Sequence, residues 1–400
     1  MAAVLDGLRV LSLCTGAVMP ELTRLLAEFG ADVIKIESAS MPDFMRRVTP
    51  NYERSPGWSD ANRNKRSFAV DLRSEEGRQI VRRLAAKVDV MGENFRGDVV
   101  DAWGLGYARI REVNPRIVYI SSQGFGRGGP DEHNPTFGPN LVASFGLQSL
   151  WSHPSERIGI GATINHPDHL AGKVGLVAVM AALEQRRLTG EGQLIDLSQA
   201  ETGAVLMGEA YLEWSYNGRE RRPLGNRSLS AAPQGAYPCA GEDRWCVLTI
   251  ETDEEWRRLA GVIGRPDAGA DSRLTTLAGR IEHHDEIDRM IAAWTRSRTP
   301  SDAAQTLQRA GIAAGWVQTA KDHLEDPHLA ARQSYVQIEH PVSGSQSYLT
   351  NQVARLSATP VLPARHAPLL GEHTDEICRD VLGMDAETIA SLRERKIVGF

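Results

Sequence analysis

Short β-rich runs alternate with helical stretches along the first third of the chain, and this alternation leaves few possible folds. The runs are rich in Val, Leu and Ile, and helical periodicity separates them, as over residues 20–29 and after Ser74. The predicted strands are residues 8–13, 32–37, 67–72, 88–91 and 116–121, with a sixth at 194–197. Because helices join successive strands, we predict an α/β fold with a mostly parallel sheet covered by helices.

The first predicted strand-to-helix turn bears on the cofactor. Residues 14–19 read Cys-Thr-Gly-Ala-Val-Met and lack the G-x-G-x-x-G pattern that lets a pyrophosphate approach the backbone. The turn therefore argues against a nicotinamide or flavin dinucleotide.

A change of composition near residue 218 indicates a domain boundary. Residues 218–227 are basic, polar and rich in turn formers, which is typical of a linker. A second α/β pattern follows, with a predicted strand over 245–250. We predict a large domain formed by residues 1–217 and 335–400, and a smaller α/β domain over 228–334.

Composition excludes several classes of partner. The formal net charge is −6, so the chain has no overall attraction for nucleic acid or an anionic membrane. No stretch approaches the roughly 20 apolar residues of a membrane span, and the first residues do not resemble an export signal. The 4 cysteines are isolated in sequence, as expected of reduced thiols. We expect a cytoplasmic protein.

Asp168 is the first candidate for chemistry, because it stands where an apolar helix is predicted to begin. Backbone N–H groups at a helix start can keep a carboxylate ionised and oriented, and such a carboxylate can be a nucleophile. Asp is also a preferred N-cap residue, so a purely structural role is the alternative. His166 and His169 flank it, but Pro167 disturbs their spacing and no further ligand follows, so we predict no metal site.

Basic and glycine-rich segments lie next to predicted strands. Residues 62–66 precede one strand, Arg73 follows it, and residues 94–96 follow another. Their Arg and Lys side chains could bind phosphates, or could simply be solvated. The segment 123–130, with Gly126, could bring N–H donors to a carbonyl or be a plain turn. No G-x-S-x-G elbow is present, and no cysteine has a basic neighbour that would favour its thiolate form, which disfavours serine and thiol hydrolases.

Segments along nearly the whole chain carry a family resemblance by their order and spacing. They are residues 5–11, 30–37, 62–67, 93–96, 105–107, 114–116, 189–193, 233–238, 311–315 and 326–329. Together they resemble the family III CoA-transferases, a group related to the α-methylacyl-CoA racemases. The resemblance implies a Rossmann-like large domain, a smaller α/β domain and a homodimer of two interlocked rings.

The resemblance also implies a reaction and its residues. Asp168 would attack an acyl-CoA thioester, giving a mixed anhydride and then an aspartyl-CoA thioester, from which a carboxylate acceptor takes the CoA. No cofactor is implied, because the CoA thioester is a substrate. The implied CoA-binding residues are Lys65, Arg66, Leu72, Arg73, Asn94, Phe95 and Arg96. Candidates for the acyl site or for oxyanion binding are Ala17, Gly126, Phe137, Gly138 and Trp151.

Two alternatives remain open. A racemase or isomerase acting at the α-carbon of an acyl-CoA needs two bases. The related racemases have an imidazole in the stretch that corresponds to residues 136–141, where this chain has none, although His153, His166 or His169 could substitute. The other alternative is a non-catalytic CoA-binding subunit of a heteromeric transferase. Ala17 stands near the place of a glutamine in formyl-CoA transferase, so substrate handling is expected to differ.

Overall fold

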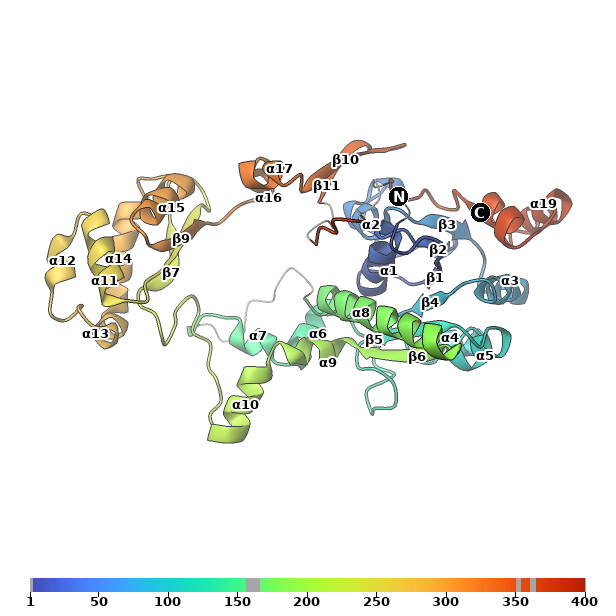
Figure 1. Cartoon of the computed structure of the whole chain (residues 1–400), viewed down its shortest axis with the longest axis horizontal. Helices are drawn as coiled ribbons and strands as arrows, with labels where there is room; N and C mark the ends of the chain where they lie inside the picture. The colour runs from blue at the N-terminus through green and yellow to red at the C-terminus, as the bar shows by residue number, and fades with distance from the viewer. Residues whose placement is uncertain (1–2, 156–165, 350–353, 360–364, 400) are drawn as a thin grey trace. The chain divides into compact units, whose positions relative to one another are not determined.

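A six-stranded parallel sheet forms the centre of the larger of two compact units in the computed structural model, which describes residues 3–155, 166–349, 354–359 and 365–399 (Figure 1). Its strands are β1 (Arg9–Leu13), β2 (Asp32–Glu37), β3 (Arg66–Ala69), β4 (Val90–Glu93), β5 (Val118–Gln123) and β6 (Gln193–Ser198). Their order is β3-β2-β1-β4-β5-β6, and every neighbouring pair is parallel. The predicted α/β fold and its six strands are confirmed.

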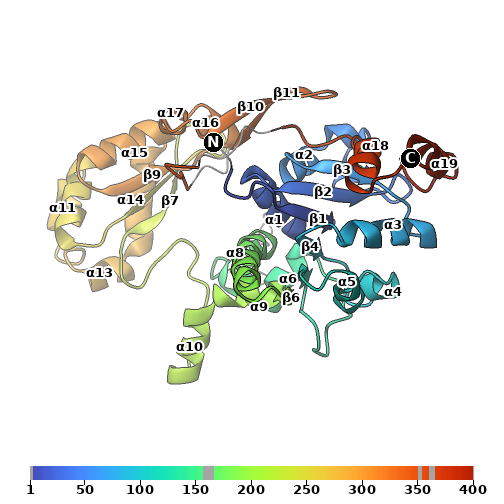
Figure 2. The same cartoon turned by 45° about the vertical axis from the view of Figure 1, so that its right-hand side comes forward.

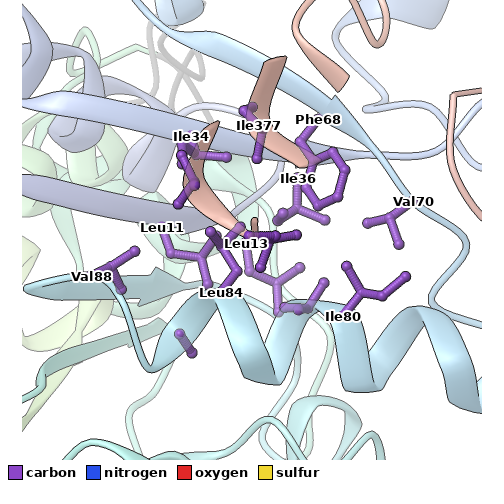
Figure 3. Packing of buried hydrophobic residues seen from close by; sticks show 14 of the residues in the cluster. Leu11, Leu13, Ile34, Ile36, Phe68, Val70, Ile80, Leu84, Val88 and Ile377 are labelled. Atoms are coloured by element: carbon purple, nitrogen blue, oxygen red, sulfur yellow. The ribbon is translucent and has the colours of Figure 1, made fainter. Parts of the chain in front are cut away.

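Alternate residues of each strand enter two different hydrophobic clusters, because successive side chains point to opposite faces of a sheet. Val10 packs with α1 (Val18–Glu28) and α8 (His166–Thr189), whereas Leu11 packs with α3 (Glu75–Ala85) on the other face. Figure 2 shows α8 and α3 on opposite sides of the strands. Figure 3 shows the second cluster, in which Ile377 from near the C-terminus joins Leu11.

The strand order places a crevice at one edge of this sheet. β1 lies between β2 and β4, so the chain leaves β1 toward one side of the sheet and leaves β4 toward the other. In open α/β sheets, ligands bind outside the carboxyl ends of the strands at this point of divergence. The loops that follow β1 and β4 are therefore expected to border the site.

Two glycines let α1 and α8 approach each other closely on one face. A Cβ at Gly172 would lie 3.0 Å from the backbone oxygen of Val18, and one at Gly175 would lie 2.6 Å from the Leu22 side chain. Any larger residue at either position would push the two helices apart. This contact fixes which side chains of α1 face the first turn of α8.

The remaining elements of the two units include short helices and a hairpin. They are η1 (Arg46–Val48), η2 (Tyr52–Arg54), α2 (Pro56–Asn62), α4 (Val99–Ala102), α5 (Tyr107–Val113), α6 (Gly138–Ser144), α7 (Leu147–Leu150), α9 (Gln199–Val205), α10 (Gly208–Asn217), α16 (Ala320–Leu324), α17 (Pro327–Ala331), β10 (Tyr335–His340), β11 (Gly344–Leu349), α18 (Thr374–Glu376), η3 (Ile377–Val381) and α19 (Ala386–Glu394). No helix of the described residues is long and apolar enough to cross a bilayer.

The second unit is built on a three-stranded antiparallel sheet with its own core around Trp256. Its main elements are β7 (Gln234–Pro238), β8 (Trp245–Thr249), β9 (Ala313–Trp316), α11 (Asp253–Val262), α12 (Pro266–Ala270), α13 (Leu277–Glu282), α14 (His284–Thr295) and α15 (Pro300–Arg309). The unit comprises Gln148–Ile160 and Glu220–Leu329, so it includes a segment that we expected in the large domain. That segment is held by Gly225, whose N–H donates to the Ser152 carbonyl at 3.1 Å.

Candidate active site

A cleft of about 830 Å³ lies at the carboxyl ends of the parallel strands, where the topology predicts a site. Its walls come from the loops after β1 and β4, the end of β5 and the first turn of α8. Its lining includes Gly16, Ala17, Glu21, Phe44, Asn94, Phe95, Arg96, Gln123, Gly124, Phe137, Gly138, Asp168 and His169. The cleft therefore brings Asp168 together with seven residues that we named from sequence: Ala17, Asn94, Phe95, Arg96, Phe137, Gly138 and His169.

Asp168 is the third residue of α8 and only 8% of its surface is exposed. Burial raises the pKa of its carboxyl to about 6; His169 opposes this change and Glu21 adds to it. Among the described residues, none makes a hydrogen bond to this carboxylate. At pH 7 roughly nine in ten molecules still carry the ionised form, which can act as a nucleophile.

The helix start differs from our prediction. α8 begins at His166, so Asp168 is not the N-cap, and Pro167 occupies the second helical position, where its missing N–H costs nothing. The expected cause of ionisation, bonds from unpaired N–H groups, is therefore wrong. Asp168 is instead a poorly solvated carboxylate that faces a cleft.

The residue after Asp168 belongs to a charged cluster that joins α8 to α1. Glu21 of α1 is 7% exposed; one of its oxygens contacts His169 Nδ1 and the other accepts from Lys173 Nζ at 2.7 Å. The hydrogen bond to Glu21 raises the pKa of His169, although burial lowers it. Despite burial, the bonds from His169 and Lys173 hold the pKa of Glu21 below its usual value. His169, which we considered as a metal ligand from sequence, therefore pairs with a carboxylate.

The loops after β1 and β4 are joined by Asn94. Thr15 N–H donates to Asn94 Oδ1, and Asn94 Nδ2 donates to the Thr15 carbonyl, each at 2.8 Å. Phe95 packs edge-on against Trp103, with ring centroids 5.3 Å apart. Arg96 is half exposed and pairs with Asp98 at 2.9 Å. These contacts hold the crevice in shape.

A second cavity, of about 310 Å³, lies at the ends of β1, β2 and β3 and shares Phe95 with the cleft. Leu72 and Arg73 line it, as does Arg47, which we did not identify from sequence. Arg47 follows a buried arginine, Arg46, in the same short helix, so nothing in the pattern distinguishes the two. Two arginines beside an apolar cavity can hold an anionic ligand with an apolar part.

Comparison with known proteins identifies the class of enzyme. The model of the family described as CoA-transferase family III matches residues 5–374. The chain belongs to this family. It is 36% identical to the succinyl-CoA–D-citramalate CoA-transferase of Chloroflexus aurantiacus, over 98% of each protein.

Two further matches agree. A probable CoA-transferase of Mycobacterium tuberculosis is 35% identical over 98% of the chain, which spans about half (50%) of that relative's length. The crystal structure of a CAIB/BAIF family protein from Brucella suis superposes with a TM-score of 0.88 at 27% identity, covering 95% of this chain and 100% of that one. The expectation of a family III CoA-transferase is confirmed.

Two of the residues that the family resemblance assigned to CoA binding do not line either cavity. Lys65 is 2% exposed, and its Nζ donates to the Pro20 carbonyl and to Asn62 Oδ1, each at 2.8 Å. Burial lowers the pKa of Lys65 well below its usual value. Arg66 pairs with Asp32 and Glu376 instead. Both residues stand at the amino end of β3, away from the carboxyl ends where the crevice opens.

Two acyl-site candidates of this CoA-transferase also lie outside the cleft. Gly124 lines the cleft, whereas Gly126 does not; a Cβ at Gly126 would lie 3.1 Å from the Ser198 side chain. Trp151 is not among the residues that line the cleft; it is 49% exposed and belongs to the second unit. Ala17, Phe137 and Gly138 do line the cleft with Asp168.

Other nucleophiles are poorly suited to this CoA-transferase's chemistry. All four cysteines are buried and unpaired as disulfides, and burial raises the pKa of Cys14, which lies nearest the first loop, to about 11. A thiol with that pKa is protonated at neutral pH and is a weak nucleophile. Within the described ranges no group of three His, Cys, Asp or Glu side chains is placed to hold a metal ion.

Proposed function

We propose that this chain is an acyl-CoA:carboxylate CoA-transferase that works through an aspartyl-CoA thioester on Asp168. One observation carries the proposal: a buried carboxylate with no hydrogen-bond partner among the described residues faces a cleft at the topological switch point. An ionised carboxylate that is poorly solvated is a better nucleophile than a fully hydrated one.

The proposed reaction has two halves, and each conserves atoms and charge. An Asp168 oxygen attacks the thioester carbonyl, and the carbon–sulfur bond breaks to give a mixed anhydride and CoA thiolate. The thiolate attacks the Asp168 carbonyl and releases the donor as a carboxylate, leaving aspartyl-CoA. The acceptor carboxylate then attacks aspartyl-CoA, and the freed thiolate takes the acceptor's acyl group. Asp168 is regenerated, and no ATP is required.

The second cavity supports a position for the CoA nucleotide. Arg47 and Arg73 would meet its phosphates, and Leu72 and Phe95 would border its adenine. Phe95 also lines the Asp168 cleft, so a pantetheine arm passing it would carry the thioester to the carboxylate. Succinyl-CoA, named as a substrate of the Chloroflexus relative, is the first donor to test.

A homodimer is part of the same proposal. Helix α10 exposes three aromatic side chains, Tyr211 (46%), Trp214 (63%) and Tyr216 (79%), and Val205 before it is 78% exposed. Large apolar side chains gathered on a surface are usually covered by a partner. A second copy of the chain, interlocked with the first as the family resemblance implies, would cover them.

The decisive experiment is intact-mass analysis after the protein is mixed with acyl-CoAs and then treated with hydroxylamine or borohydride. A hydroxamate or reduced residue at position 168, absent from Asp168→Ala, is the expected result. No adduct with any donor, together with deuterium exchange at the acyl α-carbon, would make the chain a racemase. CoA binding without adduct or exchange would make it a non-catalytic subunit.

A further inference from the structure

Only one of the two ring nitrogens of His169 has a hydrogen-bond partner among the described residues. Its Nδ1 contacts Glu21, and its Nε2 has no partner within the ranges that the structure describes. The imidazole lines the same cleft as Asp168, and its side chain is 46% exposed, so a ligand in the cleft can reach it. An imidazole whose Nδ1 is held by a carboxylate presents Nε2 in a fixed direction.

Packing restricts the conformation of the Glu21 side chain. It is 7% exposed, and it lies within the α1–α8 contact: a Cβ at Gly172 would be 3.8 Å from its Cβ and Cγ. Lys173 Nζ donates both to Glu21, at 2.7 Å, and to the His169 carbonyl, at 3.1 Å. The carboxylate is therefore packed, and its charge acts on His169 directly.

We propose that His169 donates a charged hydrogen bond from Nε2 to the reacting acyl group, and that Glu21 is the positioning residue that keeps this imidazole cationic. The inference rests on the proposed function. When Asp168 attacks the thioester, negative charge gathers on the carbonyl oxygen and then on the departing sulfur. A cation held at the cleft wall stabilises both charges without transferring a proton.

The surrounding charges decide how His169 titrates. The charged groups that act on it directly are Glu21 from α1 and Asp168 and Lys173 from α8. Arg24 pairs with Glu21, and Asp60 of α2, Arg96 and Glu132 line the same cleft. The bond to Glu21 is the largest influence and raises the His169 pKa, and Asp168 raises it too, whereas burial and Lys173 lower it. The rate should therefore fall on the alkaline side as His169 loses its proton.

The test is the pH dependence of single-turnover aspartyl-CoA formation in the wild type, Glu21→Gln and Lys173→Gln. Each variant removes one charge from the same cluster, but with opposite effect on the imidazole. In Glu21→Gln the alkaline fall should move to lower pH, so that the rate on the alkaline side drops relative to the wild type at the same pH. In Lys173→Gln the alkaline fall of the rate should move to higher pH.

NMR titration of the His169 Cε1–H signal, identified by its loss in His169→Gln, gives a second readout that does not depend on turnover. If the His169 pKa falls in Glu21→Gln while the alkaline limb stays in place, His169 has no part in the reaction. An unchanged His169 pKa would refute the role of Glu21. His169→Gln, an exposed site that should fold normally, must lose the alkaline limb altogether. Absence of any adduct in the wild type at every pH would refute the proposed function itself, and the role of His169 with it.

Discussion

Asp168→Asn should stabilise the protein, and the gain should depend on pH. The pKa of Asp168 rises from 3.8 to about 6 on folding because the carboxyl is buried. For an acid whose folded pKa is raised, the cost is present above the folded pKa and vanishes below the unfolded one. Linkage gives a cost of about 3 kcal/mol at pH 7.5 and about 1.6 kcal/mol at pH 5. A neutral amide of the same shape avoids this cost.

The assay is urea unfolding of the wild type and Asp168→Asn at the two pH values, with stabilities taken from the midpoints. Asp380→Asn is the matched control, because Asp380 is an exposed carboxylate in a surface ion pair with Arg379, and its loss should change stability by less than about 0.5 kcal/mol. If Asp168→Asn is no more stable than the wild type, or if its gain is the same at pH 5 and pH 7.5, the carboxylate is not destabilised by burial. Asp168 would then lack the poor solvation on which its proposed nucleophilicity depends.

Three further predictions concern the reaction and the assembly. The single-turnover rate of adduct formation should fall about tenfold from pH 7 to pH 5 as Asp168 is protonated, and a fall of less than twofold would contradict a pKa of about 6. Arg73→Ala should raise the KM for acyl-CoA about tenfold with little change in kcat, since Arg73 lines the second cavity, whereas Arg66→Ala should leave KM unchanged; equal effects in steady-state kinetics would refute the assignment. Trp214→Ser should weaken a dimer detected by light scattering, and an unaltered dimer would place the interface away from α10.

The parallel sheet could be predicted because each strand carries its own signal. The runs Arg9–Leu13 and Val118–Gln123 are rich in Val, Leu, Ile and Tyr and each is followed by a helical segment, so their existence and type follow from local pattern. The strand order could not be predicted, because pairing depends on contacts between segments far apart in sequence. Residues 199–217 form two helices, α9 and α10, separated at Leu206 and Met207. Gly203 and Gly208 flank that break, and glycine weakens a helix interior.

The position of Lys65 and Arg66 outside both cavities has a simple physical cause. Lys65 precedes β3 and Arg66 is its first residue, whereas Leu72 and Arg73 come after it. In a parallel sheet all strands point the same way, so residues before a strand lie at the amino edge and residues after it lie at the carboxyl edge, where ligands bind. At the amino edge Arg66 meets Asp32, the first residue of β2, in an ion pair. The direction of the strand therefore separates Lys65 and Arg66, at its amino end, from Leu72 and Arg73, beyond its carboxyl end.

The Glu21–His169 contact is a different case, because only the packed structure brings it about. Neither residue lies in a recognisable motif, and 148 positions separate them in sequence. What joins them is the close approach of α1 and α8 at Gly172 and Gly175, where a side chain would collide with the facing helix. Asp168 lies one turn before Gly172 on α8; its burial raises its pKa, and the charge on His169 opposes that rise. Since both effects depend on one helix contact, Gly172→Ala should disturb the alkaline and acid limbs of the pH profile together, whereas Glu21→Gln moves the alkaline limb most.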